Sequence, residues 1–148
     1  MTLILLADDD ELVVEMIRHV LRPHGYIVGA VDDGMQVAAI VEFKRPALVI
    51  LDCNMPELSG METLRRIRML KERHATPVLM LTACQGEFEE QLAMRAGAND
   101  YLRKPFDPDQ LVSRIETLLR RAAQLDQPDP PTPGTRRLAP VERAWGKR

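Results

Sequence analysis

Acidic side chains follow two apolar runs of this sequence. Leu3 to Ala7 are all apolar, and Asp8 to Asp10 come directly after them; Asp52 follows a second apolar run, Ala47 to Leu51. If the two runs are neighbouring strands, the carboxylates lie close together at the ends of these strands. Their mutual repulsion then raises their pKa values unless a cation lies among them. Mg²⁺ meets this need, because it takes oxygen ligands and is commonly held by one or two carboxylates.

A simpler interpretation applies to the first acids. Asp8 to Asp10 could only cap the helix that follows, because acids favour the positive end of a helix dipole. Two further polar residues, Thr82 and Lys104, also follow apolar runs. In open doubly wound sheets, ligands bind outside the carboxyl ends of the strands. These positions are therefore the ones at which we expect chemistry.

Strands and helices alternate along the chain that positions these residues. Apolar runs predict strands at 3–7, 26–31, 47–51, 78–81 and 101–102, and apolar residues at helical spacing predict helices at 11–22, 35–43, 59–70, 87–96 and 111–119. Ser59 and Glu62 form a capping-box pattern at the start of the third helix. Strands and helices that alternate in this way give an α/β fold: a doubly wound, five-stranded parallel sheet, (βα)5, with helices on both faces.

Composition limits the function classes. The 148 residues are 45% hydrophobic and 28% charged, with a formal net charge of −2, which is typical of one globular domain. There is no overall basic field, so we expect no direct nucleic-acid binding by this domain. The apolar runs are too short to cross a membrane. The N-terminus has no basic start and reaches an acid at Asp8, so we expect no signal peptide and a cytoplasmic location.

The last part of the chain differs in composition. Residues 125–148 contain four prolines between Gln127 and Gly134, and basic residues outnumber acids. We therefore expect a domain at 1–124, followed by a Pro-rich basic tail or linker at 125–148 without fixed structure. This segment could simply be solvated, or it could lead to a further domain.

Five segments stand in order at or next to the predicted strand ends. They are ILLADDD (4–10), LVILDCNMP (48–56), Ser59-Gly60, PVLMLTA (77–83) and AGANDYLRKPF (96–106). Together they resemble the receiver domain of two-component response regulators, the superfamily that includes chemotaxis regulators. The resemblance covers about Thr2 to Ala123 and implies the flavodoxin-like strand order 2-1-3-4-5.

The resemblance implies a role for each residue at the strand ends. Asp52 would accept a phosphoryl group from the phosphohistidine of a sensor histidine kinase or a phosphotransfer protein. Asp8, Asp9, Asp52 and the main-chain carbonyl of Asn54 would hold Mg²⁺, with Mn²⁺ as a substitute. Lys104 would pair with Asp52 before transfer and with a phosphoryl oxygen afterwards. The expected function is a signalling switch that assists its own phosphorylation and dephosphorylation, not an enzyme with an external substrate.

The resemblance also implies a switching mechanism. The hydroxyl of Thr82 would donate to a phosphoryl oxygen and draw its loop inward, and Tyr101 would move from an exposed to a buried position. The bond between Lys104 and Pro105 is expected to be cis.

The resemblance also implies residues that act in phosphate lifetime and in output. Asn54 and Cys84 occupy the positions that tune the lifetime of the aspartyl phosphate. Asp100 and Arg114 match a charged pair of dimer-forming transcriptional members, whereas Gln110 replaces an acid of a second pair. The expected partners are therefore a downstream effector domain or partner protein and a phosphorylation-dependent second copy.

Other functions fit this sequence less well. No Ser/Thr/Gly-rich phosphate loop and no G-x-G-x-x-G follows the first strand, which disfavours a flavodoxin-type carrier and a dinucleotide oxidoreductase. An aspartyl phosphatase would have a second acid where Asn54 stands. The main alternative is a receiver-like docking module that works without phosphorylation.

Overall fold

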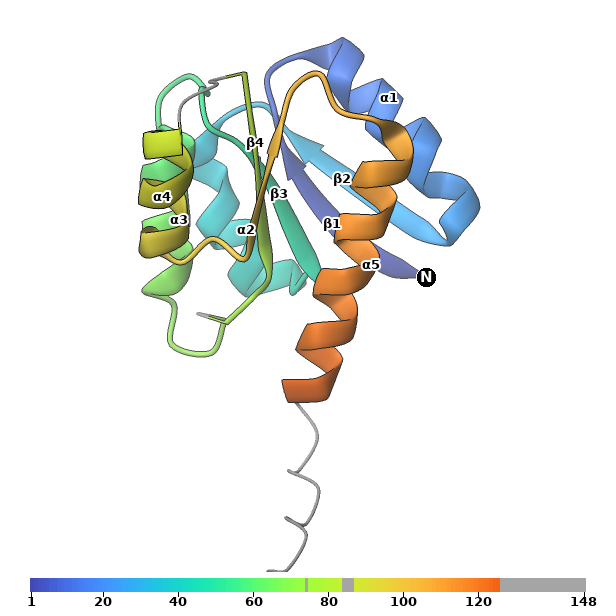
Figure 1. The fold of residues 1–148 in the computed structure, drawn as a ribbon. Helices are drawn as coiled ribbons and strands as arrows, with labels where there is room; N and C mark the ends of the chain where they lie inside the picture. The colour runs from blue at the N-terminus through green and yellow to red at the C-terminus, as the bar shows by residue number, and fades with distance from the viewer. Residues whose placement is uncertain (74, 84–86, 126–148) are drawn as a thin grey trace, which may run out of the picture.

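The structure, a computed structural model, describes residues 1–73, 75–83 and 87–125. Within these ranges five parallel strands form one sheet in the order β2-β1-β3-β4-β5, which confirms the predicted fold (Figure 1). The strands are β1 (Thr2–Ala7), β2 (Tyr26–Val31), β3 (Leu48–Asp52), β4 (Val78–Thr82) and β5 (Asp100–Arg103). The helices are α1 (Glu11–Leu21), α2 (Val37–Lys44), α3 (Gly60–Arg68), α4 (Glu87–Ala96) and α5 (Pro108–Leu125), with short 3-10 helices η1 (Arg22–His24) and η2 (Gly34–Gln36).

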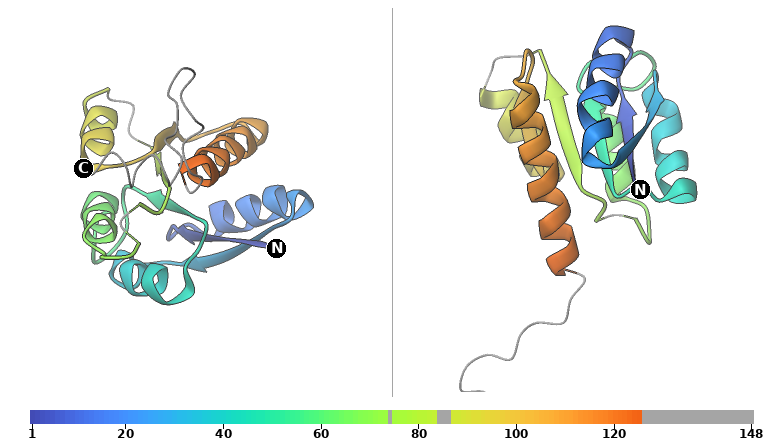
Figure 2. Two further views of the ribbon diagram at one scale, coloured as in Figure 1. Left: turned by 90° about the horizontal axis from the view of Figure 1, so that it is seen from below. Right: turned by 90° about the vertical axis from the view of Figure 1, so that its right-hand side faces the viewer.

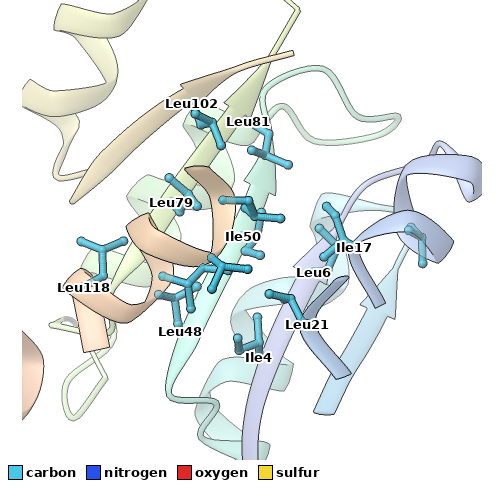
Figure 3. Close-up of a cluster of buried hydrophobic side chains, with 14 residues drawn as sticks. Ile4, Leu6, Ile17, Leu21, Leu48, Ile50, Leu79, Leu81, Leu102 and Leu118 are labelled. Atoms are coloured by element: carbon cyan, nitrogen blue, oxygen red, sulfur yellow. The ribbon is translucent and has the colours of Figure 1, made fainter. Parts of the chain in front are cut away.

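Helices cover both faces of the sheet (Figure 2). Alternate residues of each strand point to opposite faces, so Ile4 and Leu6 of β1 pack with α1 and α5, whereas Leu5 and Ala7 pack with α2, α3 and α4. The first of these clusters also contains Ile50 of the central strand (Figure 3). Burial on both faces explains why the strands read as continuous apolar runs and not as alternating ones.

Local capping fixes where the helices begin. The Asp10 carboxylate accepts from the backbone N–H of Leu12 at 3.0 Å at the start of α1, and the Ser59 hydroxyl accepts from that of Glu62 at 3.3 Å at the start of α3. The Glu62 carboxylate of the predicted capping box contacts Arg65. The second helix, predicted from Met35, begins with the 3-10 turn η2 and becomes α-helical only at Val37.

The last helix is longer than its apolar spacing predicted. α5 continues to Leu125, one residue into the predicted tail. The rest of that tail, from residue 126, and the predicted lifetime residue Cys84 lie outside the described residues. Among the described helices, none combines the length and the hydropathy that a membrane-crossing segment needs.

Candidate functional site

The carboxyl ends of four neighbouring strands meet at one edge of the sheet. Asp8 follows β1, Asp52 ends β3, Thr82 ends β4 and Lys104 follows β5, and the strand order places these ends side by side. Ligand oxygens of Asp8, Asp9 and Asp52 all lie within 4.8 Å of one another. The sheet therefore brings together the acids that the sequence analysis selected.

The acids after β1 divide into two roles. Asp8 is buried, with 2% of its surface exposed, and its carboxylate accepts from the backbone N–H of Asp10 at 2.9 Å. Asp10 is exposed and caps α1, accepting from Leu12. The simpler capping interpretation thus holds for Asp10, whereas Asp8 and Asp9 take part in the acidic cluster.

Lys104 brings a cation into this cluster. Its Nζ lies 2.8 Å from Asp8 Oδ2 and 3.7 Å from Asp52 Oδ2. The resemblance implies a pairing with Asp52, whereas the closer partner in the structure is Asp8. The backbone N–H of Lys104 donates to the Thr82 carbonyl at 2.7 Å, which ties its segment to the end of β4. The bond to Pro105 is cis, the form expected from the resemblance.

The crowding of charges shifts the titration of Asp52 and Lys104. Burial and then the nearby charge of Asp8 raise the pKa of Asp52 above its ordinary value, against the opposing effects of Lys104 and of the Asn54 backbone N–H. Burial by itself would lower the pKa of Lys104, but its hydrogen bond to Asp8 and the charges of Asp52 and Asp8 outweigh burial and raise it. Three acids thus face one lysine, and a further cation would relieve the excess of negative charge.

The donor set fits a hard divalent cation. Three carboxylates are close enough to share one ion, and carboxylate oxygens suit Mg²⁺ better than softer metals. The backbone N–H of Asn54 donates to Asp52 Oδ1 at 3.3 Å, which places the main chain of residue 54 beside the Asp52 carboxylate. The residues present are thus compatible with the metal site expected from the resemblance.

Two residues of the expected switch are buried. Thr82 is fully buried at the end of β4, one position beyond Leu81, which pairs in register with Asp52. Tyr101 is only 5% exposed and packs in the cluster beneath α2, α3 and α4. The structure therefore holds Tyr101 in the buried position, the end point of the movement expected from the resemblance.

The expected dimer pair is formed within one chain. Arg114 Nη1 on α5 lies 2.6 Å from Asp100 Oδ1 at the start of β5, and both side chains are about a third exposed. A second ion pair joins β5 to α4, with Arg103 Nη2 3.5 Å from Glu90 Oε2. These pairs fasten α4, β5 and α5 to one another on one side of the molecule.

Sequence reasoning did not assign a role to Gly60, which packs directly behind Asp52. A Cβ at this position would lie 2.4 Å from the Asp52 carbonyl oxygen and 2.8 Å from the Cys53 Cα. The Gly60 N–H also donates to the Cys53 carbonyl at 3.0 Å. A glycine in the first turn of a helix, directly after the Ser59 cap, is the sequence signal that could have indicated this close approach.

Comparison with known proteins gives consistent matches. A family model described as "Response regulator receiver domain" matches residues 4–116. The Alkaline phosphatase synthesis transcriptional regulatory protein PhoP of Bacillus subtilis is 36% identical over 119 residues, which are 80% of this chain and 49% of the relative. The Transcriptional regulatory protein CpxR of Klebsiella pneumoniae is 39% identical, over 86% of this chain and 53% of the relative. The chain thus spans about half the length of these relatives.

A solved structure of a receiver domain also matches this chain. The receiver domain of the sensor histidine kinase PA1611 from Pseudomonas aeruginosa aligns with a TM-score of 0.75 and 32% identity, covering 80% of this chain and 98% of that one. That structure has a magnesium ion coordinated in its active-site cleft.

Proposed function

Because the chain belongs to the receiver-domain family of two-component response regulators, we propose that Asp52 accepts a phosphoryl group from a phosphohistidine and that this event switches the domain. The observation that carries the proposal is the position of Asp52. Asp52 is 6% exposed and stands at the end of the central strand, and its carboxylate lies close to two further acids and one lysine.

The reaction is nucleophilic catalysis by a carboxylate. A carboxylate oxygen of Asp52 attacks the phosphorus, and a new O–P bond forms as the P–N bond of the phosphohistidine breaks. The electron pair of the P–N bond goes to the imidazole nitrogen, which then takes up a proton. The product is an aspartyl phosphate on this chain and a neutral histidine on the donor.

Charge neutralisation is the main requirement of such a transfer. Lys104 supplies one compact positive charge within 4 Å of both Asp8 and Asp52 and would pair with a phosphoryl oxygen once the acceptor is modified. Mg²⁺ held by Asp8, Asp9, Asp52 and the Asn54 carbonyl would supply further charge neutralisation, and Mn²⁺ is the expected substitute.

Switching would begin at Thr82, whose hydroxyl lies at the neighbouring strand end and can donate to a phosphoryl oxygen. The phosphorylated state would favour an inward position of the segment that carries Thr82, with Tyr101 buried. A phosphoryl group shifts this equilibrium only to the extent that it contacts the two states differently. Asn54 and Cys84 would set how long the modification lasts.

The output belongs to the proposal as well. The relatives are longer proteins with names that denote transcriptional regulation, so we propose that this domain controls an attached effector domain or a separate partner protein. It would act as a cytoplasmic switch and not as an enzyme on an external substrate. A phosphorylation-dependent homodimer would require Asp100 and Arg114 to exchange their contact within the chain for one between chains.

Phosphorylation by a small donor tests the proposal. The full chain is incubated with acetyl phosphate and Mg²⁺, and intact mass is recorded for the native protein, for Asp52→Asn and for Asp32→Asn, a matched change of an exposed acid. We expect one phosphoryl adduct on the native chain and on Asp32→Asn. The adduct should be absent from Asp52→Asn and absent when EDTA removes the metal. A native chain that gains no adduct at saturating donor would support the phosphorylation-independent docking module instead.

A further inference from the structure

A cavity of about 500 Å³ lies at the amino end of the sheet, opposite the acidic cluster. It is formed by the loops that precede β3 and β4 and by the last turns of α5, the helix that extends past this end of the sheet in Figure 1. Its volume is within the range of small-molecule sites, ~300–1,000 Å³. We call it the amino-end cavity.

The lining of the amino-end cavity combines basic and apolar groups. Arg45, Arg73 and Arg121 line it, and among the described residues of the lining Glu72 is the one acid. Pro46 and Leu118, also in the lining, are buried and give it an apolar floor. A few polar groups above an apolar floor are typical of sites for small organic molecules, in which the polar groups fix the orientation of the ligand.

Two of the three arginines can offer donors to a ligand. Arg45 and Arg121 are exposed, so their guanidinium groups are accessible from solvent. Arg73 is half-buried; its Nε is fully covered and has no acceptor among the described residues, so a ligand in the cavity would meet the rest of its guanidinium group. Other arginines of this chain do have acceptors, as Arg18, Arg68 and Arg114 show.

Arg45 occupies an unusual backbone position. It ends α2 with φ of 51°, in the left-handed region that favours glycine or asparagine at a helix end. Its side chain is exposed and lines the cavity, so its charge lies at the rim, where a helix C-terminus also favours a base.

The wall of the cavity is held in place before any ligand binds. Arg68 Nη1 donates to the Thr76 carbonyl at 2.7 Å, and its Nη2 donates to Asn99 Oδ1 at 2.8 Å. Asn99 Oδ1 also accepts from the Val78 N–H at 2.9 Å. Thr76 and Asn99 both line the cavity. Such preorganisation lowers the cost of ordering a site when a ligand arrives.

We propose that the amino-end cavity binds a small organic anion. Its carboxylate or phosphate group would pair with Arg73, Arg45 and Arg121, and its apolar body would lie against Pro46 and Leu118. Arginine suits this ligand because its planar fork of N–H groups matches two oxygens of a carboxylate or phosphate. The bound anion would bridge α5 to the loops before β3 and β4. This site does not depend on the phosphorylation of Asp52.

Binding is tested with phenylphosphonate, whose P–C bond prevents phosphoryl transfer, and with benzoate and inorganic phosphate. Amide shifts of the full ¹⁵N-labelled chain are followed by NMR without Mg²⁺. We expect saturable shifts at Ala47, Thr76 and Ala122 with phenylphosphonate or benzoate, and weaker binding of inorganic phosphate, which lacks the apolar body. The two organic probes distinguish a phosphate from a carboxylate ligand.

Variants locate the binding groups. Arg73→Gln should weaken binding about tenfold, because it removes a charged donor, and hydrogen bonds between charged groups are roughly twice as strong as neutral ones. Arg73→Lys, which keeps the charge but not the fork, should also bind more weakly than the native chain. Arg120→Gln is the matched control, because Arg120 is exposed on α5 next to Arg121 but does not line the cavity; its affinity should stay native.

Three results would overturn the proposal. The first is the absence of saturable shifts at these amides up to millimolar probe. The second is equal binding of phenylphosphonate and inorganic phosphate, which would indicate a counter-ion effect alone. The third is native affinity in both Arg73→Gln and Arg121→Gln. The exposed position of Arg121 makes its variant a safe second test if Arg73→Gln folds poorly.

Discussion

The carboxyl end of the sheet gathers acids around one lysine, whereas the amino end gathers arginines around an apolar floor. At the carboxyl end, three carboxylates lie within 4.8 Å of one another, and backbone packs tightly behind Asp52. At the amino end, Arg45, Arg73 and Arg121 line a cavity of about 500 Å³. One sheet thus presents two opposite electrostatic environments.

Helix direction accounts for this difference. In an alternating parallel fold each helix begins near the carboxyl end of a strand and ends near the amino end of the next one. Acids are stabilised near helix N-termini and bases near helix C-termini, as with Asp10 before α1 and with Lys44 and Arg68 in the last turns of α2 and α3. The fold therefore favours an anionic site at one end and a cationic site at the other.

Loss of the lysine at the carboxyl end should have the largest effect on stability. Lys104→Met leaves the buried carboxylate of Asp8, whose side chain is fully covered, without its cation. Breaking a buried ion pair typically costs 3–5 kcal/mol, so we expect the free energy of unfolding to fall by about 3 kcal/mol in EDTA. Urea unfolding measures this change, with the exposed Lys44→Met as the control. Equal losses in the two variants would show that the acidic end does not depend on its lysine.

A methyl group added behind Asp52 should have the next largest effect. Gly60→Ala places a Cβ 2.4 Å from a backbone oxygen, so backbone must shift, and overpacking of this kind costs about 1–3 kcal/mol. Gly29→Ala is the matched control in β2, because its Cβ would meet only Leu3 Cδ1 at 3.9 Å. Thermal unfolding should separate the two variants, and a Gly60→Ala protein as stable as Gly29→Ala would contradict the close packing described here.

Removal of the Asp52 charge should stabilise the metal-free protein. Because the folded-state pKa of Asp52 is raised, mainly by burial, native stability is lost as the pH rises from the ordinary aspartate pKa through the folded-state value, and it stays lower above that window. Asp52→Asn lacks this loss, so at neutral pH it should be about 1 kcal/mol more stable in EDTA. Urea unfolding at several pH values tests this, and added Mg²⁺ should reduce the difference. A less stable Asp52→Asn protein at neutral pH would show that crowding of charge is not the dominant effect.

The smallest effect is expected for the ion pair at the amino end of β5. The side chains of Asp100 and Arg114 are about a third exposed, so a double-mutant cycle with Asp100→Asn and Arg114→Gln should give a coupling of about 0.5 kcal/mol. The pair that follows the same strand at its carboxyl end, Lys104 with Asp8, should couple several times more strongly. Similar coupling energies for the two pairs would contradict the view that the carboxyl end of β5 is buried and its amino end exposed.

Periodicity predicted the elements of the fold because each strand is buried on both faces and each helix on one. It could not order the strands, and that order came only from the resemblance to a family. The sequence pattern also could not predict contacts between segments that are far apart in the chain. Lys104 and Asp8 are far apart in the sequence, and no rule about residue spacing predicts that they form an ion pair. The amino-end cavity combines two loops with the end of α5, and its arginines follow no motif in the sequence.

The position of the phosphoryl group tests the central claim most directly. The native chain, phosphorylated by acetyl phosphate with Mg²⁺, is treated with borohydride, which reduces an acyl phosphate to the alcohol, and peptides are then sequenced by mass spectrometry. The account predicts that residue 52 is converted to homoserine and that this product is absent without donor. Conversion at Asp8 or Asp9, or a phosphate retained on Thr82, would contradict it.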